Sequence, residues 1–279
     1  MYDLHIHTTA SDGLFTPAQV IDMATELGLT GIAITDHDTM SGLKIAADCL
    51  KSNKISLDVI PGIEINTDVE IGEVHILGYY VDANNQAMCQ RLMEIKSARR
   101  QRALVMIEKL ADLGMFIMVD EVEKRAKGDL IGRPHIAMVL KERCYVKSVK
   151  EAFDMYIGQG RPAYAPRYKF PPEEAIALIH QAGGAAVLAH PGLIKDARTI
   201  DEIIALGIDG IEVFYPEHDH LQITHYKNLA DSNKLLITGG SDFHGMDTMD
   251  SHSAMGTCGI SDKFFTTIKH NLQKNIKYL

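Results

Sequence analysis

The sequence predicts an α/β fold with roughly seven strand–helix units that are split by one inserted run of helices. Short apolar strands alternate with amphipathic helices in two stretches, residues 3–80 and residues 172–271. Every segment between about residues 85 and 158 instead has the apolar spacing of a helix. Such alternation is typical of a mainly parallel sheet or barrel, so we expect a sheet or barrel that carries a helical subdomain.

The first stretch begins with a strand and a well-marked helix. Thr16 can cap this helix and Pro17 suits its first turn, while Val20 and Ile21 lie on its apolar face. In chain order we expect strand Asp3–His7, helix Pro17–Gly28, strand Gly31–Thr35, helix Ser41–Lys51 and strands Leu57–Asn66 and Glu70–Tyr80.

The inserted segment and the second stretch complete the pattern. The expected inserted helices are Gln86–Leu113, Val119–Ala126, Arg133–Lys141 and Val149–Ile157. Alternation returns with helix Pro172–Ala182, strand Ala185–His190, helix Ile200–Leu206, strand Gly210–Phe214, helix His220–Ser232, strand Leu235–Thr238 and helix Phe264–Asn271. We therefore divide the chain into a first barrel part (1–84), an inserted helical subdomain (85–165) and a second barrel part (166–279).

Composition excludes several classes of protein. The 279 residues are 46% hydrophobic, which excludes wholesale disorder. No run approaches the roughly 18 apolar residues of a membrane-spanning helix, and no signal peptide is readable at the start. The four Cys residues are far apart without a CxxC pair, which favours reduced thiols and a cytoplasmic location. The net charge of −9 argues against a stable DNA complex, and the oligomeric state stays open.

The 13 His residues gather where predicted strands end. His5 and His7 close the first strand, and residues two apart in a strand point to the same side. The other His and acidic residues at or near strand ends are Asp12, His37, Glu64, His75, His190, His218, Asp242 and His244. The carboxyl ends of parallel barrel strands meet at one face, so these side chains are expected to converge.

Imidazole and carboxylate ligands together suit Mn, Fe or Zn and fit poorly with a site for Ca alone. Taken singly, each residue has an ordinary explanation, such as a core position for His75 or a helix cap for Asp242. Asp36 and Asp38 are interpreted as caps, turn formers or supports for the ligands. The joint pattern nevertheless predicts a metal centre, whereas His180, His225, His252 and His270 are interpreted as surface residues and His220 is left open.

The motifs resemble those of the polymerase-and-histidinol-phosphatase (PHP) family. They are, in the family's order, His5-Ile6-His7-Thr8, Ser11-Asp12-Gly13, Thr35-Asp36-His37-Asp38-Thr39, Gly62-Ile63-Glu64, Ala189-His190-Pro191 and Ser241-Asp242-Phe243-His244. The resemblance implies a distorted (β/α)7 barrel with up to three divalent metals at its carboxyl-end face. The inserted motifs Ile131-Gly132-Arg133-Pro134-His135 and Gly160-Arg161-Pro162 are similar to those of small stand-alone members, which include nucleoside 3′,5′-bisphosphate phosphatases and a 5′-3′ exoribonuclease.

The resemblance also implies which residues hold two or three divalent ions. A first ion would take His5, His7, Glu64 and Asp242, a second Asp12, His37 and His244, and a third Glu64, His75 and His190. Asp12 and Asp242 are then expected to act in catalysis, and His218 to protonate the leaving group or hold phosphate. Two such ions would lower the pKa of a bridging water and clamp the phosphoryl oxygens.

Arginines of the insertion are expected to bind substrate phosphates, because a guanidinium matches phosphate oxygens. They are Arg99, Arg100, Arg102 and Arg133. We therefore predict a phosphoesterase for small phosphorylated nucleotides, with a 5′-3′ exonuclease on short RNA as the alternative. A histidinol-phosphate phosphatase usually has His at the position of Asp12, and an amidohydrolase often has a lysine at a strand end, which is missing here. A metal-binding module without turnover is the remaining class.

Overall fold

A computed structural model describes residues 1–53, 55–70, 72–126, 130–166, 168–245 and 253–266. Its centre is a seven-stranded sheet in which the strands lie side by side in chain order. The strands are β1 (Tyr2–Ile6), β2 (Gly31–Ile34), β3 (Asp58–Val69), β4 (Gly72–Tyr79), β5 (Ala185–Leu188), β6 (Gly210–Phe214) and β7 (Leu236–Gly239).

The sheet curls into a nearly closed barrel. Next to β7, Phe243 forms a parallel bridge with Ile6 of β1, and the His7 amide donates to the Phe243 carbonyl at 2.9 Å. Strand β4 is antiparallel to both β3 and β5, while the other neighbouring pairs are parallel. Only two residues lie between the end of β3 and the start of β4, which is too short for the crossover helix that a parallel pair would need. The predicted distorted barrel is thereby confirmed, and the distortion comes from this hairpin.

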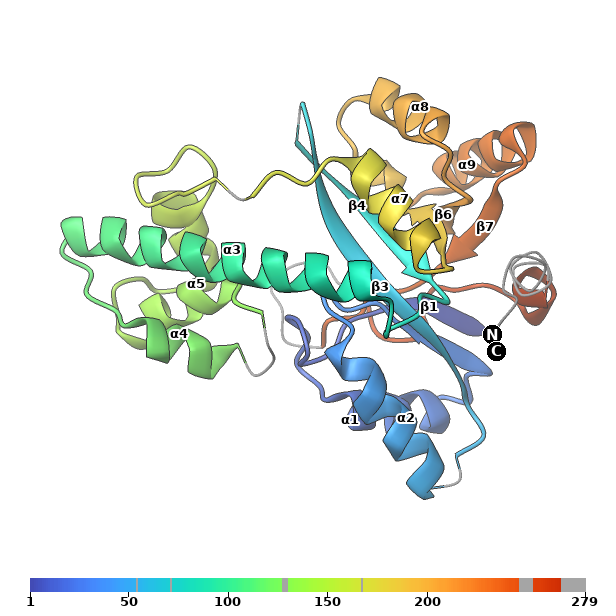
Figure 1. The fold of residues 1–279 in the computed structure, drawn as a ribbon, viewed down its shortest axis with the longest axis horizontal. Coiled ribbons are helices and arrows are strands. Elements are labelled where there is room, and N and C mark those ends of the chain that lie inside the picture. Colours follow the sequence, from blue (N-terminus) through green and yellow to red (C-terminus); the bar gives the residue numbers. More distant parts are fainter. Residues whose placement is uncertain (54, 71, 127–129, 167, 246–252, 267–279) are drawn as a thin grey trace.

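Helices cover the outside of the sheet (Figure 1). Helices α1 (Pro17–Glu26) and α2 (Ser41–Asn53) lie on one side, and α7 (Pro172–Gln181), α8 (Ala197–Ala205) and α9 (His220–Asn233) on the other. Thr16 caps α1 as predicted, because its side chain accepts from the Gln19 amide. Helix α8 begins three residues before the predicted Ile200, where Asp196 caps it. Most of the predicted helix Phe264–Asn271 lies outside the described residues.

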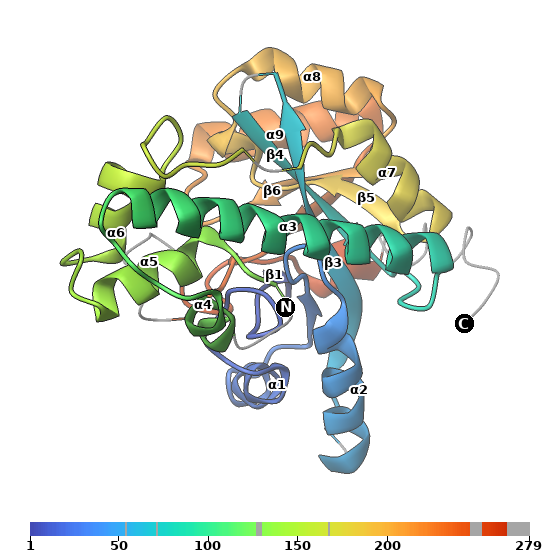
Figure 2. The same ribbon diagram turned by 60° about the vertical axis from the view of Figure 1, so that its left-hand side comes forward.

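The insertion builds a second apolar core. Its elements are α3 (Gln86–Asp112), α4 (Val119–Arg125), α5 (Arg133–Glu142), α6 (Val149–Ala152) and a π-helical turn at Phe153–Ile157, where an α-helix was expected. Met106 and Leu110 of α3 pack in this core with the other inserted helices, whereas Met88 and Ile95 of α3 pack in the barrel core. Helix α3 crosses in front of the sheet and joins the insertion to the barrel (Figure 2).

The proposed subdomain at 85–165 is supported by this separate core, although it shares its first helix with the barrel. In the part of the chain that the structure describes, none of the helices has the length and apolar character needed to cross a membrane.

Candidate metal centre

The predicted ligands converge at the carboxyl-end face of the barrel. His5 lies in β1 and Glu64 in β3, while His7, His37, His190 and Asp242 follow the ends of parallel strands. His75 belongs to β4, where it is the fourth residue. Since β4 runs in the opposite direction, the first half of this strand lies at the same face as the ends of the parallel strands. The reversed strand therefore brings His75 to the other ligands.

A first group surrounds Asp242. Its Oδ1 atom lies 3.3 Å from His5 Nε2 and 3.2 Å from His7 Nε2. The same two nitrogens lie 3.5 and 3.2 Å from the two oxygens of Glu64. All four side chains are buried.

A second group surrounds Asp12. Its carboxylate lies 3.4 Å from His244 Nε2 and 3.9 Å from His37 Nε2. His7 Nδ1 is 3.8 Å from Asp12, so the His7 ring stands between the first group and the second.

A third group surrounds Glu64. Its Oε1 atom lies 2.9 Å from His75 Nδ1 and 3.1 Å from His190 Nε2. His37 Nδ1 is 2.8 Å from the other oxygen, Oε2. Glu64 thus takes part in the first group and the third, as expected of a bridging ligand.

Among the residues that the structure describes, several buried polar atoms at this face make no hydrogen bond of good geometry, although ion-pair partners lie near them. They are His5 Nε2, His7 Nδ1 and Nε2, Asp12 Oδ1 and Glu64 Oε2. An unsatisfied buried polar atom costs about 1–3 kcal/mol, so such a cluster indicates a missing partner. A divalent cation supplies that partner, and nitrogen with carboxylate oxygen suits Mn, Fe or Zn. The residues therefore fit divalent metal ions.

The pKa values reflect close opposite charges in the protein without metal. Burial lowers the pKa of His37, but Glu64 and Asp12 outweigh it and raise the pKa to about 10. Burial likewise lowers the pKa of His244, and Asp12 raises it to about 9. Burial raises the pKa of Glu64, yet His37 and His75 hold this pKa well below its usual range. The Glu64 carboxylate is thus charged and can bind a cation.

Two acidic residues that follow β2 support the ligands, which is one of the roles that the sequence suggested for them. Asp36 accepts from the Thr8 amide at 2.7 Å and the Ser11 hydroxyl at 2.6 Å, which fixes the loop that carries Asp12. Asp38 accepts from Arg99 and from the Asn66 amide at 3.0 Å.

The backbone at this face is strained. Asp38, His190 and Asp242 have φ angles of 48°, 28° and 52°, which non-glycine residues seldom adopt. Strain of this kind persists where surrounding contacts hold it, and it gathers at functional sites.

Sequence reasoning missed three supporting residues. The Asn66 side chain lies 3.2 Å from His37 Nδ1, and the Tyr215 hydroxyl donates to Asp242 Oδ2 at 3.0 Å. Glu212, in the otherwise apolar strand β6, contacts His5 at 3.0 Å. The sequence held one signal for Glu212, an acidic residue inside a strand that is otherwise apolar. Buried acids are nearly always paired, so such a residue indicates a partner nearby.

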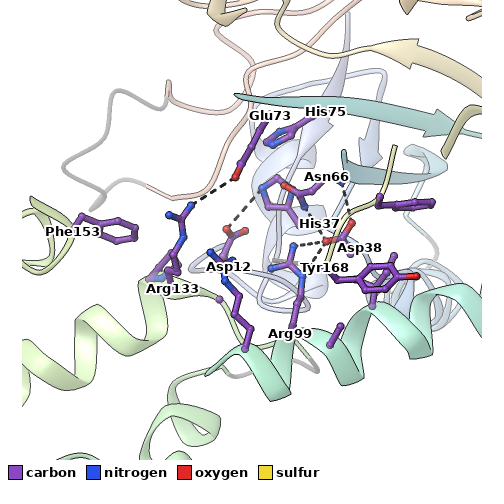
Figure 3. A pocket seen from close by; sticks show the side chains of 16 residues that line it. Asp12, His37, Asp38, Asn66, Glu73, His75, Arg99, Arg133, Phe153 and Tyr168 are labelled. Atoms are coloured by element: carbon purple, nitrogen blue, oxygen red, sulfur yellow. Dashed lines mark hydrogen bonds and ion pairs between the residues drawn. The ribbon is translucent and has the colours of Figure 1, made fainter. Parts of the chain in front are cut away.

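A cavity of about 240 Å³ opens beside the ligands and under the insertion. Asp12, His37 and His75 line its barrel side, and α3 and α5 supply Arg99, Arg102 and Arg133 (Figure 3). The Arg102 Nε donates to the Ala165 carbonyl at 2.8 Å. Burial and the neighbouring Arg133 lower the pKa of Arg102 to about 10, because both disfavour its charged form.

Two predicted substrate residues lie elsewhere. Arg100 is 53% exposed and pairs with Glu123 at 2.8 Å, since it points away from Arg99 and Arg102 on α3. His218 lies within 2.9 Å of the Val213 carbonyl through Nδ1 and accepts from the Gly192 amide through Nε2. Backbone groups thus occupy both ring nitrogens, and neither residue lines the cavity.

Comparisons with known proteins identify the family of this chain. The chain matches the PHP domain model over residues 3–157. It is 34% identical over 249 residues to a 5′-3′ exoribonuclease of Escherichia coli, covering 88% of this chain and 85% of the relative. It is 33% identical over 248 residues to a 3′,5′-nucleoside bisphosphate phosphatase of Chromobacterium violaceum, covering 87% and 86%.

A solved structure from Bifidobacterium adolescentis, assigned as a metal-dependent phosphoesterase, superposes with a TM-score of 0.86 at 30% identity. The match covers 99% of this chain and 96% of that one. These findings confirm the resemblance drawn from the motifs. The chain belongs to the PHP family and is a metal-dependent phosphoesterase.

Proposed function

We propose that this enzyme removes a phosphate from small nucleotides that carry two phosphates, such as nucleoside 3′,5′-bisphosphates. One observation carries the proposal: Arg102 and Arg133 face a cavity that adjoins the metal ligands. Among the described residues no carboxylate forms an ion pair with Arg102, and Arg133 reaches Glu73 only at 4.0 Å. Cations without close counterions suit a second phosphate, while the first lies at the metal centre.

Different sets of residues would bind the different ions at the metal centre. We propose the ligand sets His5, His7, Glu64 and Asp242; Asp12, His37 and His244; and Glu64, His75 and His190. Two or three Mn, Fe or Zn ions held there would lower the pKa of a water and neutralise phosphoryl oxygens. Asp12 and Asp242 would hold the ions that bind the reacting phosphate, and Glu64 belongs to both the first set and the third.

The insertion then selects the substrate. Arg102 and Arg133 bind the phosphate that is not cleaved, and Arg99 supports the cavity from its ion pair with Asp38. Tyr168 and Phe153 give the cavity aromatic walls, which suits a nucleoside. Arg100 and His218 are left out of the proposal, since neither lines the cavity. A cytoplasmic location stays a prediction from the sequence.

A 5′-3′ exonuclease on short RNA is the second candidate. It is supported by the similarity to the Escherichia coli relative, a 5′-3′ exoribonuclease that is 34% identical to this chain. Both activities would use the same metal ligands and differ in what fits beyond the first nucleotide.

A substrate panel tests the proposal. The Mn²⁺-loaded enzyme is given a nucleoside 3′,5′-bisphosphate, the matching monophosphates and a 5′-phosphorylated RNA oligonucleotide. We expect the highest kcat/KM for the bisphosphate, because only this small substrate places one phosphate at each locus. Faster release of mononucleotides from the oligonucleotide would favour the exonuclease, and no hydrolysis in the panel would refute both.

A further inference from the structure

Strand β6 places one carboxylate beneath the metal centre. Glu212 is fully buried, with 0% exposure, and each of its oxygens contacts a different predicted ligand. We infer that Glu212 is a positioning residue that holds His5 and His190 in place for metal binding. The inference rests on the ligand sets proposed above.

The contact with His5 fixes which nitrogen faces the metal centre. His5 Nδ1 lies 3.0 Å from Glu212 Oε1, within hydrogen-bond distance. A proton on Nδ1 leaves the lone pair on Nε2, which is the atom that faces Asp242 and Glu64. Within the described residues, His5 Nε2 is also one of the buried atoms that make no hydrogen bond. Glu212 therefore aims the ligand nitrogen at the position of the cation.

The contact with His190 acts through the backbone. The His190 amide donates to Glu212 Oε2 at 2.8 Å, and this residue has a strained φ angle of 28°. The hydrogen bond helps to hold the strained conformation, from which His190 Nε2 reaches Glu64 Oε1 at 3.1 Å. The pairing of β6 with β7 shifts register between Glu212 and Phe214. Such irregularities re-aim side chains next to active sites.

Only a carboxylate suits this position. Glu212 accepts from two donors at once, one on each oxygen, whereas a glutamine amide offers a single acceptor. In the described part of the chain, His5 is its one ion-pair partner.

The contacts predict a selective effect on the three ligand sets. Glu212 touches His5 of the first set and His190 of the third. In the part of the chain that the structure describes, it contacts no member of the second set, Asp12, His37 and His244. Loss of Glu212 should therefore weaken the first and third sites and leave the second intact.

The test is Mn²⁺ binding by the Glu212→Gln variant, measured as equivalents bound in equilibrium dialysis. We expect the Mn²⁺ affinity to fall about 10- to 100-fold at two sites, as is typical when a partner of a ligating His is lost, with the remaining site within about twofold of wild type. Tyr79→Phe is the matched control, because it removes a buried hydrogen bond to the Leu4 carbonyl and changes no predicted ligand. Equal weakening of all sites, or unchanged binding in a folded variant, would overturn the inference.

A second measurement needs no variant, in case Glu212→Gln fails to fold. In the Zn²⁺-loaded wild-type protein, ¹⁵N NMR should show His5 with a proton on Nδ1 and zinc on Nε2. The opposite arrangement would overturn the inference. Both readouts report metal binding without turnover, so a failed substrate panel leaves this test unaffected, and a wild-type protein that binds no metal would refute the ligand sets themselves.

Discussion

Arg102 and Arg100 lie two residues apart on helix α3 but have opposite surroundings. Arg102 lines the cavity, whereas Arg100 is 53% exposed and pairs with Glu123. We expect Arg102→Ala to raise KM for the bisphosphate about 10- to 100-fold, since a hydrogen bond to a charged group contributes about 1.5–3 kcal/mol. The bound Mn²⁺ should stay at the wild-type amount. Arg100→Ala is the control on the same helix and should leave KM unchanged.

Steady-state kinetics with metal analysis on both variants decides this point. A wild-type KM in the Arg102→Ala enzyme would show that the Arg102 guanidinium does not bind the substrate. An enzyme that also lost metal would instead indicate damage to the ligand cluster.

Asp242 contacts both His5 and His7 through one oxygen and accepts from Tyr215 on the other. Asp242→Ala should therefore lose metal and activity together. The loss of kcat/KM should exceed about a hundredfold, because changes to a ligand's neighbours alone cost 10- to 100-fold. Metal analysis and turnover on the bisphosphate check this, with the exposed Asp231→Asn as control. Full activity in Asp242→Ala would refute the ligand assignment.

At the residue scale, the sequence revealed the groups that end strands and missed the groups that support them. His5, His7 and Asp242 lie in short motifs with readable spacing. Glu212 and Tyr215 act across strands, and no local spacing connects them to the residues that they touch. His218 also follows a strand, but backbone groups nearby occupy its ring, which only the folded chain reveals.

At the element scale, a buried ion pair ties the insertion to the barrel. Arg99 of α3 donates to Asp38, whose side chain is 2% exposed. Burial raises the pKa of Asp38, but Arg99 outweighs this and keeps the pKa below its usual value. Arg99→Leu leaves a buried charge unpaired, so we expect unfolding free energy to fall by about 3–5 kcal/mol in urea titrations.

The Arg99→Leu/Asp38→Asn double variant should recover part of that loss, because the unpaired charge is gone. Lys150→Ala, which breaks an exposed pair with Asp154, should change stability by less than about 1 kcal/mol. If Arg99→Leu were as mild as Lys150→Ala, the pair would not hold α3 on the barrel.

The elements themselves followed from local pattern, while their directions did not. Periodicity located β3 and β4, yet the reversal of β4 depends on the absence of a crossover helix and on pairing with the distant β5. The π-helical turn at Phe153–Ile157 was not predicted for a similar reason. Its apolar spacing is helical, and the longer span of its hydrogen bonds, five residues in place of four, shows only in the backbone.

At the scale of the whole molecule, metal and protons compete for the same ligands. In the metal-free protein the pKa of His37 is about 10 and that of His244 about 9, since nearby carboxylates outweigh the effect of burial. Both values exceed the ordinary His pKa of 6.5 in the unfolded chain. These groups therefore contribute stability that is complete below about pH 6.5 and is lost as the pH rises through 9 and 10.

Removal of the metal should therefore make the stability of the protein fall as the pH becomes alkaline. We expect the Tm of the EDTA-treated protein to fall by about 5 °C or more between pH 7 and pH 9. The Mn²⁺-loaded protein should change less, because a metal-bound imidazole is already neutral and loses no proton in this pH range, and metal binding strengthens as protons leave the ligands. Thermal unfolding of both forms in one buffer series measures the difference. Parallel curves would mean that His37 and His244 do not exchange protons for metal, and the second ligand set would then have to be abandoned.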